Sequence, residues 1–309
     1  MIARAKDIRT VLMIGNGRMG TDIGLQCALY GREDRYFIGL ETPAEALEPI
    51  QKRQRDYLDM LIQRGYITPR VAEEALSRVS FNTDIAGICE GIDLAVEAVP
   101  ETVEAKQAVW SRFAPHLPKH AILATNTTAL RPSLYAENSG APERFLAWHF
   151  ATPAYIQNFV DLMPTEKTDP ALISVMKEVS EEIGLNCGVL EKEIPHYITI
   201  NMLFGFVDKA FELVLEGCAD YRQIDKAWMS VRQVPVGPFG IVDKITLPLM
   251  RNIYAARSDQ SDLTRRIMAY LDEQIADGRL GLPYGRGFYD YPNPEFEHPD
   301  FVKPARRLE

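Results

Sequence analysis

The chain has 309 residues, of which 46% are hydrophobic and 25% are charged, a composition typical of a globular protein with a sizeable core. Its formal net charge of −9 argues against nucleic acid and against an anionic membrane surface as partners, because like charges repel. We expect no membrane span, since no apolar run approaches the roughly 18 residues that one requires. We also expect no targeting peptide, since the first predicted strand begins about ten residues into the chain.

The four cysteines, Cys27, Cys89, Cys187 and Cys218, are scattered along the chain. They form no C-x-x-C pair, and no histidine lies near them at the spacing of a metal site. We therefore expect buried, free cysteines in a reducing compartment, the cytoplasm, and no metal centre.

An apolar run at 10–14 leads directly into three glycines in the order G-x-G-x-x-G. In a dinucleotide-binding loop the first glycine makes the turn, the second lets the pyrophosphate approach, and the third lets the following helix pack on the strand. Glycines also cluster in ordinary loops, so the context decides: a strand comes first here, and a helix is predicted at 19–29. The residues predicted to bind the cofactor are Gly15, Gly17, Arg18, Met19 and Gly20.

A second strand is predicted at 36–40 and ends at Glu41. Glu41 follows Gly20 by about twenty residues, where a dinucleotide fold places the carboxylate that binds the ribose 2′-hydroxyl. This carboxylate would repel a 2′-phosphate, so we expect NAD rather than NADP as the cofactor. Arg32 and Arg35 precede the predicted strand and are interpreted as solvated loop charges, with a phosphate contact as the alternative.

A long amphipathic helix is predicted at 44–64, and one of its faces carries Lys52, Arg53 and Arg55. Two interpretations of this basic face are equally good: a solvated helix surface, or a patch that binds the acidic tail of a substrate. Further short elements are predicted after this helix. They are a helix at 68–76, a strand at 79–81 and a helix at 85–89.

Strands and helices continue to alternate beyond this point. Strands are predicted at 94–98, 121–124, 145–150, 158–163 and 187–190, with helices at 103–113 and 170–183. This alternation predicts a parallel, doubly wound Rossmann sheet, in which ligands bind beyond the carboxyl ends of the strands. The polar residues that fall at such ends are Glu101, Asn126, Thr128 and His149.

The pattern changes near residue 192. From there only helices are predicted, at 194–215, 221–229, 241–251 and 261–277. We therefore predict two domains: a nucleotide-binding Rossmann domain over 1–192 and an all-helical domain over 193–309. The first helix of the second domain is too apolar to be fully solvated. We expect it to bury part of its surface against a second copy of the chain, as a homodimer.

His149 ends one predicted strand, and Asp161 lies on the next. A carboxylate bonded to one ring nitrogen fixes the imidazole tautomer, and the other nitrogen can then act as a general base. Hydride removal from an alcohol carbon needs such a base, because the hydroxyl must lose its proton as the hydride leaves. On spacing alone, a structural histidine between two strands is an equally good interpretation. Thr128 either bonds the reacting oxygen or serves only its own turn.

Taken together, the chain resembles the L-3-hydroxyacyl-CoA dehydrogenase family of NAD enzymes nearly from end to end. The segments that carry the resemblance are Ile14–Gly20, Val96–Glu101 with Lys106, Ala124–Thr128, Phe145–Phe150, Phe159–Asp161, Glu216–Gly217, Ile224–Asp225, Gly237–Asp243 and Gly285–Tyr289. Each match is modest alone, whereas their order is specific. The resemblance implies a Rossmann domain followed by a helical dimerisation domain.

The resemblance also implies a role for each matched residue. His149 matches the family's catalytic base, and Asp161 matches the glutamate that orients it. Thr128 matches a serine whose hydroxyl bonds the substrate oxygen. The implied cofactor contacts are Glu101 and Lys106 on the nicotinamide-side ribose and Asn126 beside the nicotinamide.

Several positions depart from the family pattern. Asp161 has one methylene less than the family's glutamate, and Thr152 replaces an asparagine. Ile200 stands where the family has an active-site asparagine, while the adjacent Asn201 lies about 100° around the helix axis. An apolar side chain at 200 removes a polar contact and is expected to alter substrate choice or turnover. The residues predicted to contact the substrate are Thr152, Ile200, Asn201, Lys52 and Arg55.

Three functional hypotheses follow. The first is NAD-dependent oxidation of an L-3-hydroxyacyl-CoA, with a short chain preferred, to the 3-ketoacyl-CoA. The second is the same hydride transfer on a non-CoA 3-hydroxy or 3-keto acid, such as a carnitine- or gulonate-like compound. The third is an NAD-binding protein that has lost its catalytic activity.

Overall fold

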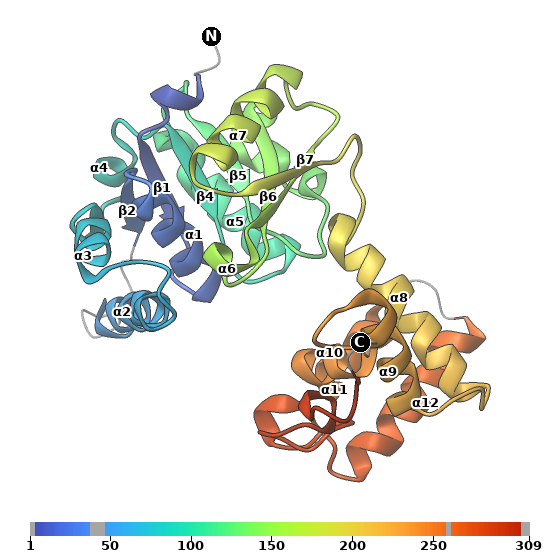
Figure 1. Cartoon of the computed structure of the whole chain (residues 1–309). Helices are drawn as coiled ribbons and strands as arrows, with labels where there is room; N and C mark the ends of the chain where they lie inside the picture. Colours follow the sequence, from blue (N-terminus) through green and yellow to red (C-terminus); the bar gives the residue numbers. More distant parts are fainter. Residues whose placement is uncertain (1–3, 38–46, 258–260, 304–309) are drawn as a thin grey trace. The chain divides into compact units, whose positions relative to one another are not determined.

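The computed structural model describes residues 4–37, 47–257 and 261–303 (Figure 1). Its contacts divide the chain into two compact units, Met1–Ile198 and Thr199–Glu309, each of which is described by itself. The division therefore falls after residue 198 rather than after the predicted residue 192. The predicted cofactor residue Glu41 lies outside the described residues.

The first unit is built on an eight-stranded sheet in the order β3-β2-β1-β4-β5-β6-β7-β8. Its strands are β1 (Thr10–Ile14), β2 (Glu33–Phe37), β3 (Val79–Asn82), β4 (Leu94–Glu97), β5 (Ile122–Thr125), β6 (Phe145–Phe150), β7 (Phe159–Pro164) and β8 (Asn186–Val189). The predicted doubly wound Rossmann fold is confirmed. Neighbouring strands are parallel except for β6 and β7, which are antiparallel. The connection 151–158 is too short for a crossover, so β7 returns directly beside β6.

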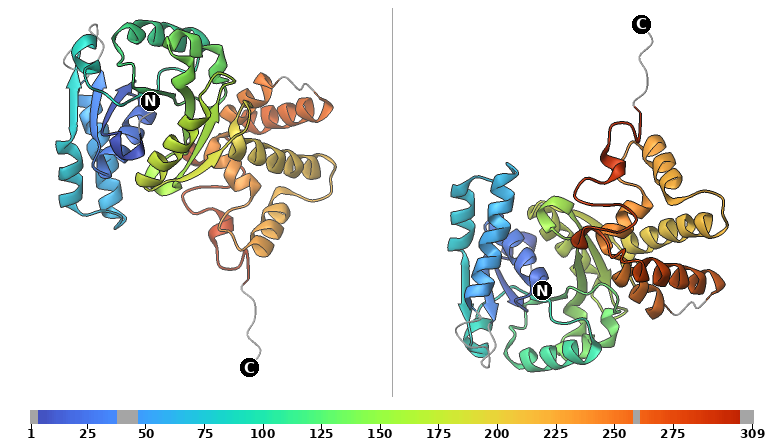
Figure 2. Two further views of the ribbon diagram at one scale, coloured as in Figure 1. Left: turned by 90° about the horizontal axis from the view of Figure 1, so that it is seen from above. Right: turned by 90° about the horizontal axis from the view of Figure 1, so that it is seen from below.

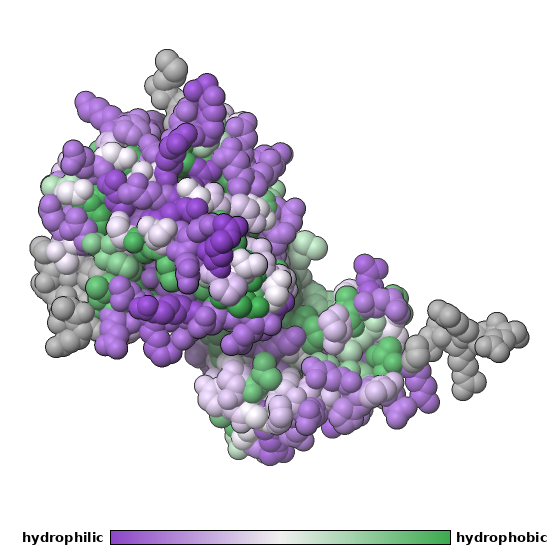
Figure 3. All heavy atoms as spheres, turned by 60° about the vertical axis from the view of Figure 1, so that its left-hand side comes forward, coloured by the Kyte–Doolittle hydropathy of each residue, from purple (hydrophilic) through white to green (hydrophobic). Residues whose placement is uncertain are grey.

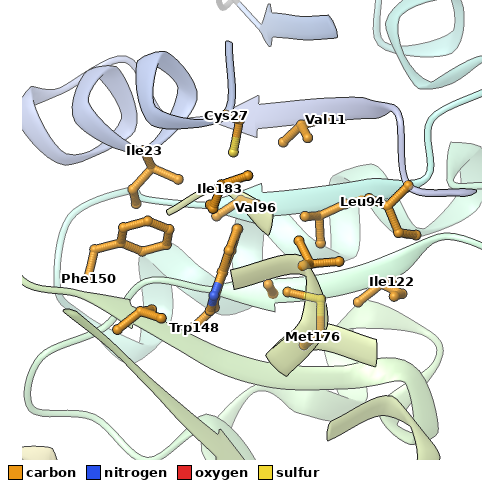
Figure 4. Packing of buried hydrophobic residues seen from close by; sticks show 14 of the residues in the cluster. Val11, Ile23, Cys27, Leu94, Val96, Ile122, Trp148, Phe150, Met176 and Ile183 are labelled. Carbon is orange, nitrogen blue, oxygen red and sulfur yellow. The ribbon is translucent and has the colours of Figure 1, made fainter. Parts of the chain in front are cut away.

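Helices cover both faces of this sheet because its central strands are apolar on both sides. They are α1 (Arg18–Leu29), α2 (Leu47–Gln63), α3 (Pro69–Ser77), α4 (Ile85–Cys89), α5 (Val103–Phe113), α6 (Ala154–Gln157) and α7 (Pro170–Glu182). On β1, Val11 and Met13 join the core under α1 and α7, whereas Leu12 and Ile14 join the core under α5. Figure 4 shows the first of these cores around Trp148.

Several helices begin at a residue type that caps helices. The side chains of Thr68, Asp84, Thr102 and Asp169 each accept a hydrogen bond from a backbone N–H in the first turn of α3, α4, α5 and α7. Short 3-10 helices complete the first unit. They lie at Ala5–Asp7, Ala114–His116, Pro132–Leu134, Ala136–Ser139 and Pro142–Arg144.

The predicted position of the second strand was only partly correct, because β2 already begins at Glu33. Arg35 is therefore part of this strand, and it donates to the backbone oxygen of Glu90 at 2.6 Å. Arg32 is buried rather than solvated, and it donates to the backbone oxygen of Ile8 and to Glu182. The interpretation of both arginines as solvated loop charges is wrong, since each binds a backbone carbonyl group.

The second unit is helical, as predicted, and Figure 2 shows its helices from two further directions. They are α8 (Tyr197–Leu215), which begins just before the division, α9 (Tyr221–Arg232), α10 (Pro238–Ile245), α11 (Leu247–Ala256) and α12 (Asp262–Ala276), with 3-10 helices at Leu282–Tyr284 and Glu295–Glu297. The single helix predicted at 241–251 is instead two helices. They are separated at Thr246, whose φ of 84° cannot continue a right-handed helix.

Two buried carboxylates connect the helices of this unit to its closing segment. Asp225 on α9 accepts hydrogen bonds from the first turn of α10 and from the Tyr289 hydroxyl. Asp243 on α10 accepts from the backbone N–H groups of Phe288 and Tyr289 and from the Tyr291 hydroxyl. The motif residues 224–225, 237–243 and 285–289 thus meet in one hydrogen-bonded core.

No helix within the described ranges is long and apolar enough to cross a membrane. The face of the molecule in Figure 3 is mostly hydrophilic, in keeping with the high content of charged residues.

Strand β2 carries a buried carboxyl group that has no hydrogen-bond partner among the described residues. Both carboxylate oxygens of Asp34 are buried and accept no hydrogen bond from any described residue. The strand register places Asp34 between Val11 and Val79. Burial raises the pKa of the Asp34 carboxyl well above its model-compound value of 3.8, and the nearby charge of Arg32 opposes this shift. Asp34 therefore destabilises the fold.

Asp34→Val is expected to raise the free energy of unfolding by about 1–3 kcal/mol, because it removes an unsatisfied polar group from the core. The destabilisation by Asp34 that comes from its ionisation is absent at low pH and grows as the pH rises from the unfolded pKa of the carboxyl to its raised folded pKa. Urea unfolding at about pH 5 and about pH 8 measures both effects, since the pH dependence should be shallower in the variant. Equal stability and equal pH dependence in the two proteins would contradict this account.

Candidate active site

The glycine loop joins β1 to α1 and leaves one side open. Gly15 has a φ of 120°, and a Cβ atom there would overlap the backbone oxygen of Ala98. A Cβ atom on Gly20 would overlap the backbone oxygen of Gly15. A Cβ atom on Gly17, in contrast, would meet no atom within 4 Å. The first and third glycines are thus required by packing, and the second faces space next to the free N–H groups of α1, where a pyrophosphate fits.

The remaining loop residues and the basic face of α2 have different surroundings. Arg18 is exposed at the first turn of α1, and Met19 packs against the core. Arg53 donates to the backbone oxygen of Asn16 at 2.7 Å, so it supports the glycine loop. Lys52 forms an exposed ion pair with Asp56 on its own helix. Arg55 is exposed, and it forms no hydrogen bond or ion pair with any described residue.

His149 and Asp161 lie directly opposite each other on the antiparallel strands β6 and β7. Nδ1 of His149 is 3.3 Å from Oδ2 of Asp161, and both side chains are buried, with 8% and 2% of their residue surfaces exposed. The prediction that adjacent strands carry this pair side by side is confirmed. An Nδ1–H donated to the carboxylate leaves Nε2 as the acceptor of the ring.

A buried network of charges connects β4, α5 and the end of β5. The Lys106 ammonium group is fully buried, and it donates to both carboxylate oxygens of Glu97, at 2.9 and 3.1 Å. It also donates to the backbone oxygen of Asn126 at 3.2 Å. Thr125 donates to the other side of Glu97 at 2.6 Å. Burial raises the pKa of Glu97, and the charge of Lys106 opposes this shift.

Glu101 holds the loop that follows β5. Its Oε1 atom accepts hydrogen bonds from the Thr127 hydroxyl and from the backbone N–H groups of Thr128 and Ala129. Partial burial raises the pKa of Glu101, but these donors and Lys106 outweigh it and lower the pKa. The Thr128 side chain is left exposed on this loop. Glu101 therefore fixes the backbone of the loop that carries Thr128.

The polar groups at the strand ends converge as predicted from the topology. Asn126 follows β5, and its Oδ1 atom accepts from the backbone N–H of Phe150 at the end of β6. Because β1, β4, β5 and β6 are parallel, the glycine loop, Glu101, Asn126 and His149 share one edge of the sheet.

Thr152 has a structural partner. Its hydroxyl donates to Oδ2 of Asp22 on α1 at 2.6 Å. Burial raises the pKa of Asp22, and the Thr152 hydrogen bond opposes this shift. The segment after β6 is thus attached to the cofactor-binding helix. Ile200 and Asn201 lie on α8 in the second unit, so their predicted contact with the substrate stays a prediction.

Sequence reasoning missed three residues of this region: Asp22, Glu97 and Tyr197. Glu97 could have been predicted from the sequence, because a charged residue at the end of an otherwise apolar strand needs a buried partner. Asp22 lies on a helix whose buried side also contains polar residues. Tyr197 lies inside the helix predicted at 194–215, where the sequence indicates no turn. Among the described residues no group of three or more histidine, cysteine or acidic side chains could hold a metal ion.

Lys106→Met is expected to lower the free energy of unfolding by about 3–5 kcal/mol, because it leaves the Glu97 carboxylate buried without a counter-ion. The double variant Lys106→Met with Glu97→Gln should recover most of this loss, since neither charge then remains. Urea unfolding followed by tryptophan fluorescence measures the effect, as Trp110 and Trp148 are both buried in this unit. A single variant as stable as the wild type would show that Lys106 does not compensate Glu97.

Comparisons with known proteins match both units to one family. The 3-hydroxyacyl-CoA dehydrogenase NAD-binding domain matches residues 10–194. The 3-hydroxyacyl-CoA dehydrogenase C-terminal domain matches residues 197–291. The two matches together include the glycine loop, the buried charge network, His149, Asp161 and the helices of the second unit.

Individual relatives agree with this match. A probable 3-hydroxybutyryl-CoA dehydrogenase of Bacillus subtilis is 26% identical over 286 residues, which are 92% of this chain and 98% of the relative. The solved structure of a diketoreductase, with dual catalysis of dicarbonyl compounds, is 31% identical with a TM-score of 0.82, over 92% of this chain and 99% of its own. The (S)-3-hydroxybutyryl-CoA dehydrogenase of Ralstonia eutropha is 25% identical with a TM-score of 0.81, over 93% and 100% of the two chains. The chain therefore belongs to the 3-hydroxyacyl-CoA dehydrogenase family and is an NAD-dependent oxidoreductase of that type.

Proposed function

We propose that the protein interconverts an L-3-hydroxyacyl-CoA and the corresponding 3-ketoacyl-CoA, with short acyl chains preferred and His149 as the general base. One observation carries this proposal: the buried pair of His149 and Asp161 lies at the same edge of the sheet as the glycine loop. A dehydrogenase of this type needs a base beside the cofactor, and no other described histidine is as deeply buried beside a carboxylate at that edge.

The proposed reaction separates a proton from a hydride. In the oxidative direction Nε2 of His149 takes the hydroxyl proton, the C–O bond becomes a carbonyl, and the hydride leaves from the same carbon. NAD supplies the acceptor for that hydride when it is bound at the glycine loop. Asp161 keeps the proton on Nδ1 and stabilises the imidazolium that forms. Thr128 donates a hydrogen bond to the reacting oxygen.

The cofactor contacts are assigned on the same grounds. The backbone of Gly15–Gly20 and the first turn of α1, with Arg18 and Met19, bind the pyrophosphate, and Glu41 binds a ribose. Glu101 is partly exposed and binds the nicotinamide-side ribose, while Asn126 lies next to the nicotinamide. Lys106 acts indirectly, because its side chain is fully buried. Its ammonium group forms an ion pair with Glu101 and donates to the backbone oxygen of Asn126, and so holds both residues in position.

A non-CoA 3-keto or 1,3-dicarbonyl compound is the second candidate substrate. Two of the three basic residues on the face that was considered for the acidic tail of a substrate already have partners: Lys52 pairs with Asp56, and Arg53 binds the glycine loop. Only Arg55 of the three remains with its charge exposed and no such contact described. The relative that is a diketoreductase favours the same alternative.

Substitution of His149 tests the proposed base. His149→Gln is expected to lower kcat/KM for reduction of acetoacetyl-CoA by about 10²–10⁴-fold, the usual contribution of a general acid or base. Asp161→Asn should give a smaller loss with the same substrate, because it removes the orienting group and leaves the base. NADH absorbance measures the rates, and NADH binding by fluorescence is the control for folding. Activity of His149→Gln within a few-fold of the wild type would exclude this residue as the base.

A substrate panel separates the two candidate substrates. If the CoA thioester is used, acetoacetyl-CoA should have a kcat/KM far above that of acetoacetate and of longer 3-keto acids. Arg55→Gln should then raise the KM for acetoacetyl-CoA and leave the KM for NADH unchanged. Lys52→Gln is the matched control, since its charge is already paired. A preference for the free acids supports the second candidate, and NADH binding without turnover on the whole panel supports a protein that has lost its activity.

The oligomeric state and the cellular compartment are proposed from features outside the active site. We infer a homodimer through the helical unit, because an apolar groove of about 520 Å³ lies between α8 and α9 and includes Trp228 and the exposed Val231. A monomeric mass in solution at micromolar concentration would contradict this. We infer a cytoplasmic location, because the four cysteines are free. Cys27 and Cys89 are buried as predicted, whereas Cys187 is partly buried and Cys218 is exposed. Fractionation of cells that produce the protein tests this location.

A further inference from the structure

A tyrosine ring lies flat against the ring of His149. The centroids of the Tyr197 and His149 rings are 4.2 Å apart, and the ring planes are inclined by only 10°. Tyr197 has no exposed surface. We propose that Tyr197 is a positioning residue for the reaction, because its ring fixes the plane of the imidazole and supports the charge that the imidazole acquires. This inference rests on the proposed role of His149 as the base.

The backbone that presents Tyr197 is unusual. His196 and Tyr197 both have left-handed backbone conformations, with φ of 66° and 50°. Residues with a Cβ atom rarely adopt this conformation, and two in succession persist only where the surroundings hold them in place. Such outliers are concentrated at functional sites. Here they turn the chain at the start of α8 and direct the tyrosine ring back to the sheet.

Packing holds the Tyr197 ring in its position against His149. Tyr197 belongs to a small buried cluster with Ala147, Met163 and Leu190, which come from β6, β7 and the end of β8. The ring therefore lies between this cluster and His149. Any rotation of the imidazole out of its plane would bring the imidazole edge into the tyrosine ring.

Two contacts then restrain the imidazole, one at an edge and one on a face. Asp161 binds the Nδ1 edge, and Tyr197 covers one face, so the Nε2 edge is the part of the ring left for a substrate. When Nε2 takes a proton, the imidazole becomes a cation over an aromatic face, and the attraction between the two rings increases. An interaction that strengthens during proton transfer lowers the barrier rather than the binding energy of the substrate.

The tyrosine hydroxyl is not the acting group in this proposal. Burial raises the pKa of Tyr197 far above its usual range, and the neighbouring Tyr135 and Glu101 raise it further. The hydroxyl is therefore protonated at neutral pH. This separates the ring from the hydroxyl as the functional element, and the two can be tested by different substitutions.

The kinetic test compares Tyr197→Leu, which removes the ring, with Tyr197→Phe, which keeps it. For oxidation by NAD of the 3-hydroxy counterpart of the panel substrate that is turned over fastest, Tyr197→Leu should lower kcat about three- to tenfold, as expected for loss of an aromatic pair. The KM for that substrate and the dissociation constant for NADH should stay within about twofold of the wild type. Tyr197→Phe should retain the wild-type kcat. An unchanged kcat in Tyr197→Leu, or an equal loss in both variants, would overturn the proposal.

A structural measurement keeps the proposal testable if Tyr197→Leu fails to fold. A proton above an aromatic face is shifted upfield in NMR spectra, so the imidazole C–H signals of His149 should lie upfield of those of the other four histidines. His149→Gln assigns these signals. Signals at ordinary positions would overturn the proposal. Full activity of His149→Gln would contradict the proposed base, whereas an inactive His149→Gln beside a fully active Tyr197→Leu would contradict only the role of Tyr197.

Discussion

A single buried ammonium group organises the edge of the sheet where the cofactor loop and the histidine meet. Lys106 comes from α5, and it binds Glu97 at the end of β4 and the backbone oxygen of Asn126 just after β5. A charge in the interior is tolerated only while its partners stay in place. These three elements therefore cannot separate without exposing an uncompensated charge. Through Glu101 the same constraint extends to the loop that carries Thr128.

The pair of His149 and Asp161 depends on a different kind of constraint. It is positioned by strand pairing rather than by charge, since the antiparallel register sets the two residues opposite each other. The distance of 3.3 Å between the ring and the carboxylate agrees with an acid that is one methylene shorter than the family's glutamate. The second oxygen of Asp161 is buried and accepts no hydrogen bond within the described chain. The carboxylate is therefore oriented by the ring alone, which makes the support of the ring from its other side important.

The sequence was most informative where burial alone decides the structure. The central strands were predicted well because they are continuously apolar, and the glycine loop was predicted because packing permits no side chain at Gly15 or Gly20. The alternation of strands and helices predicted a parallel sheet, and the antiparallel direction of β7 was missed although the short connection 151–158, which leaves no room for a crossover, indicates it. The start of β2 was missed because Asp34 and Arg35 are charged residues in a strand.

The residues of the site were likewise predicted where the local sequence determines the structure and missed where tertiary contacts determine it. His149 and Asp161 were found because both lie at recognisable positions on predicted strands. The break at Thr246 and the turn at His196 and Tyr197 were not found, because ordinary residues adopt left-handed conformations there only under contacts made after folding. Lys106 was correctly placed near the cofactor region by the resemblance, but its burial, and hence its indirect action, appears only in three dimensions.

The short connection between β6 and β7 has a consequence for how this protein can diverge from its relatives. Side chains alternate between the two faces of a strand, so inserting or deleting one residue that shifts the β7 register would turn Asp161 away from His149 and bring a neighbouring apolar residue in its place. Substitutions in 151–158 leave this register intact. Apart from Thr152, which binds Asp22, and the buried Ala154, the segment can therefore change in composition, and with it the shape of the adjoining surface, while its length is held constant.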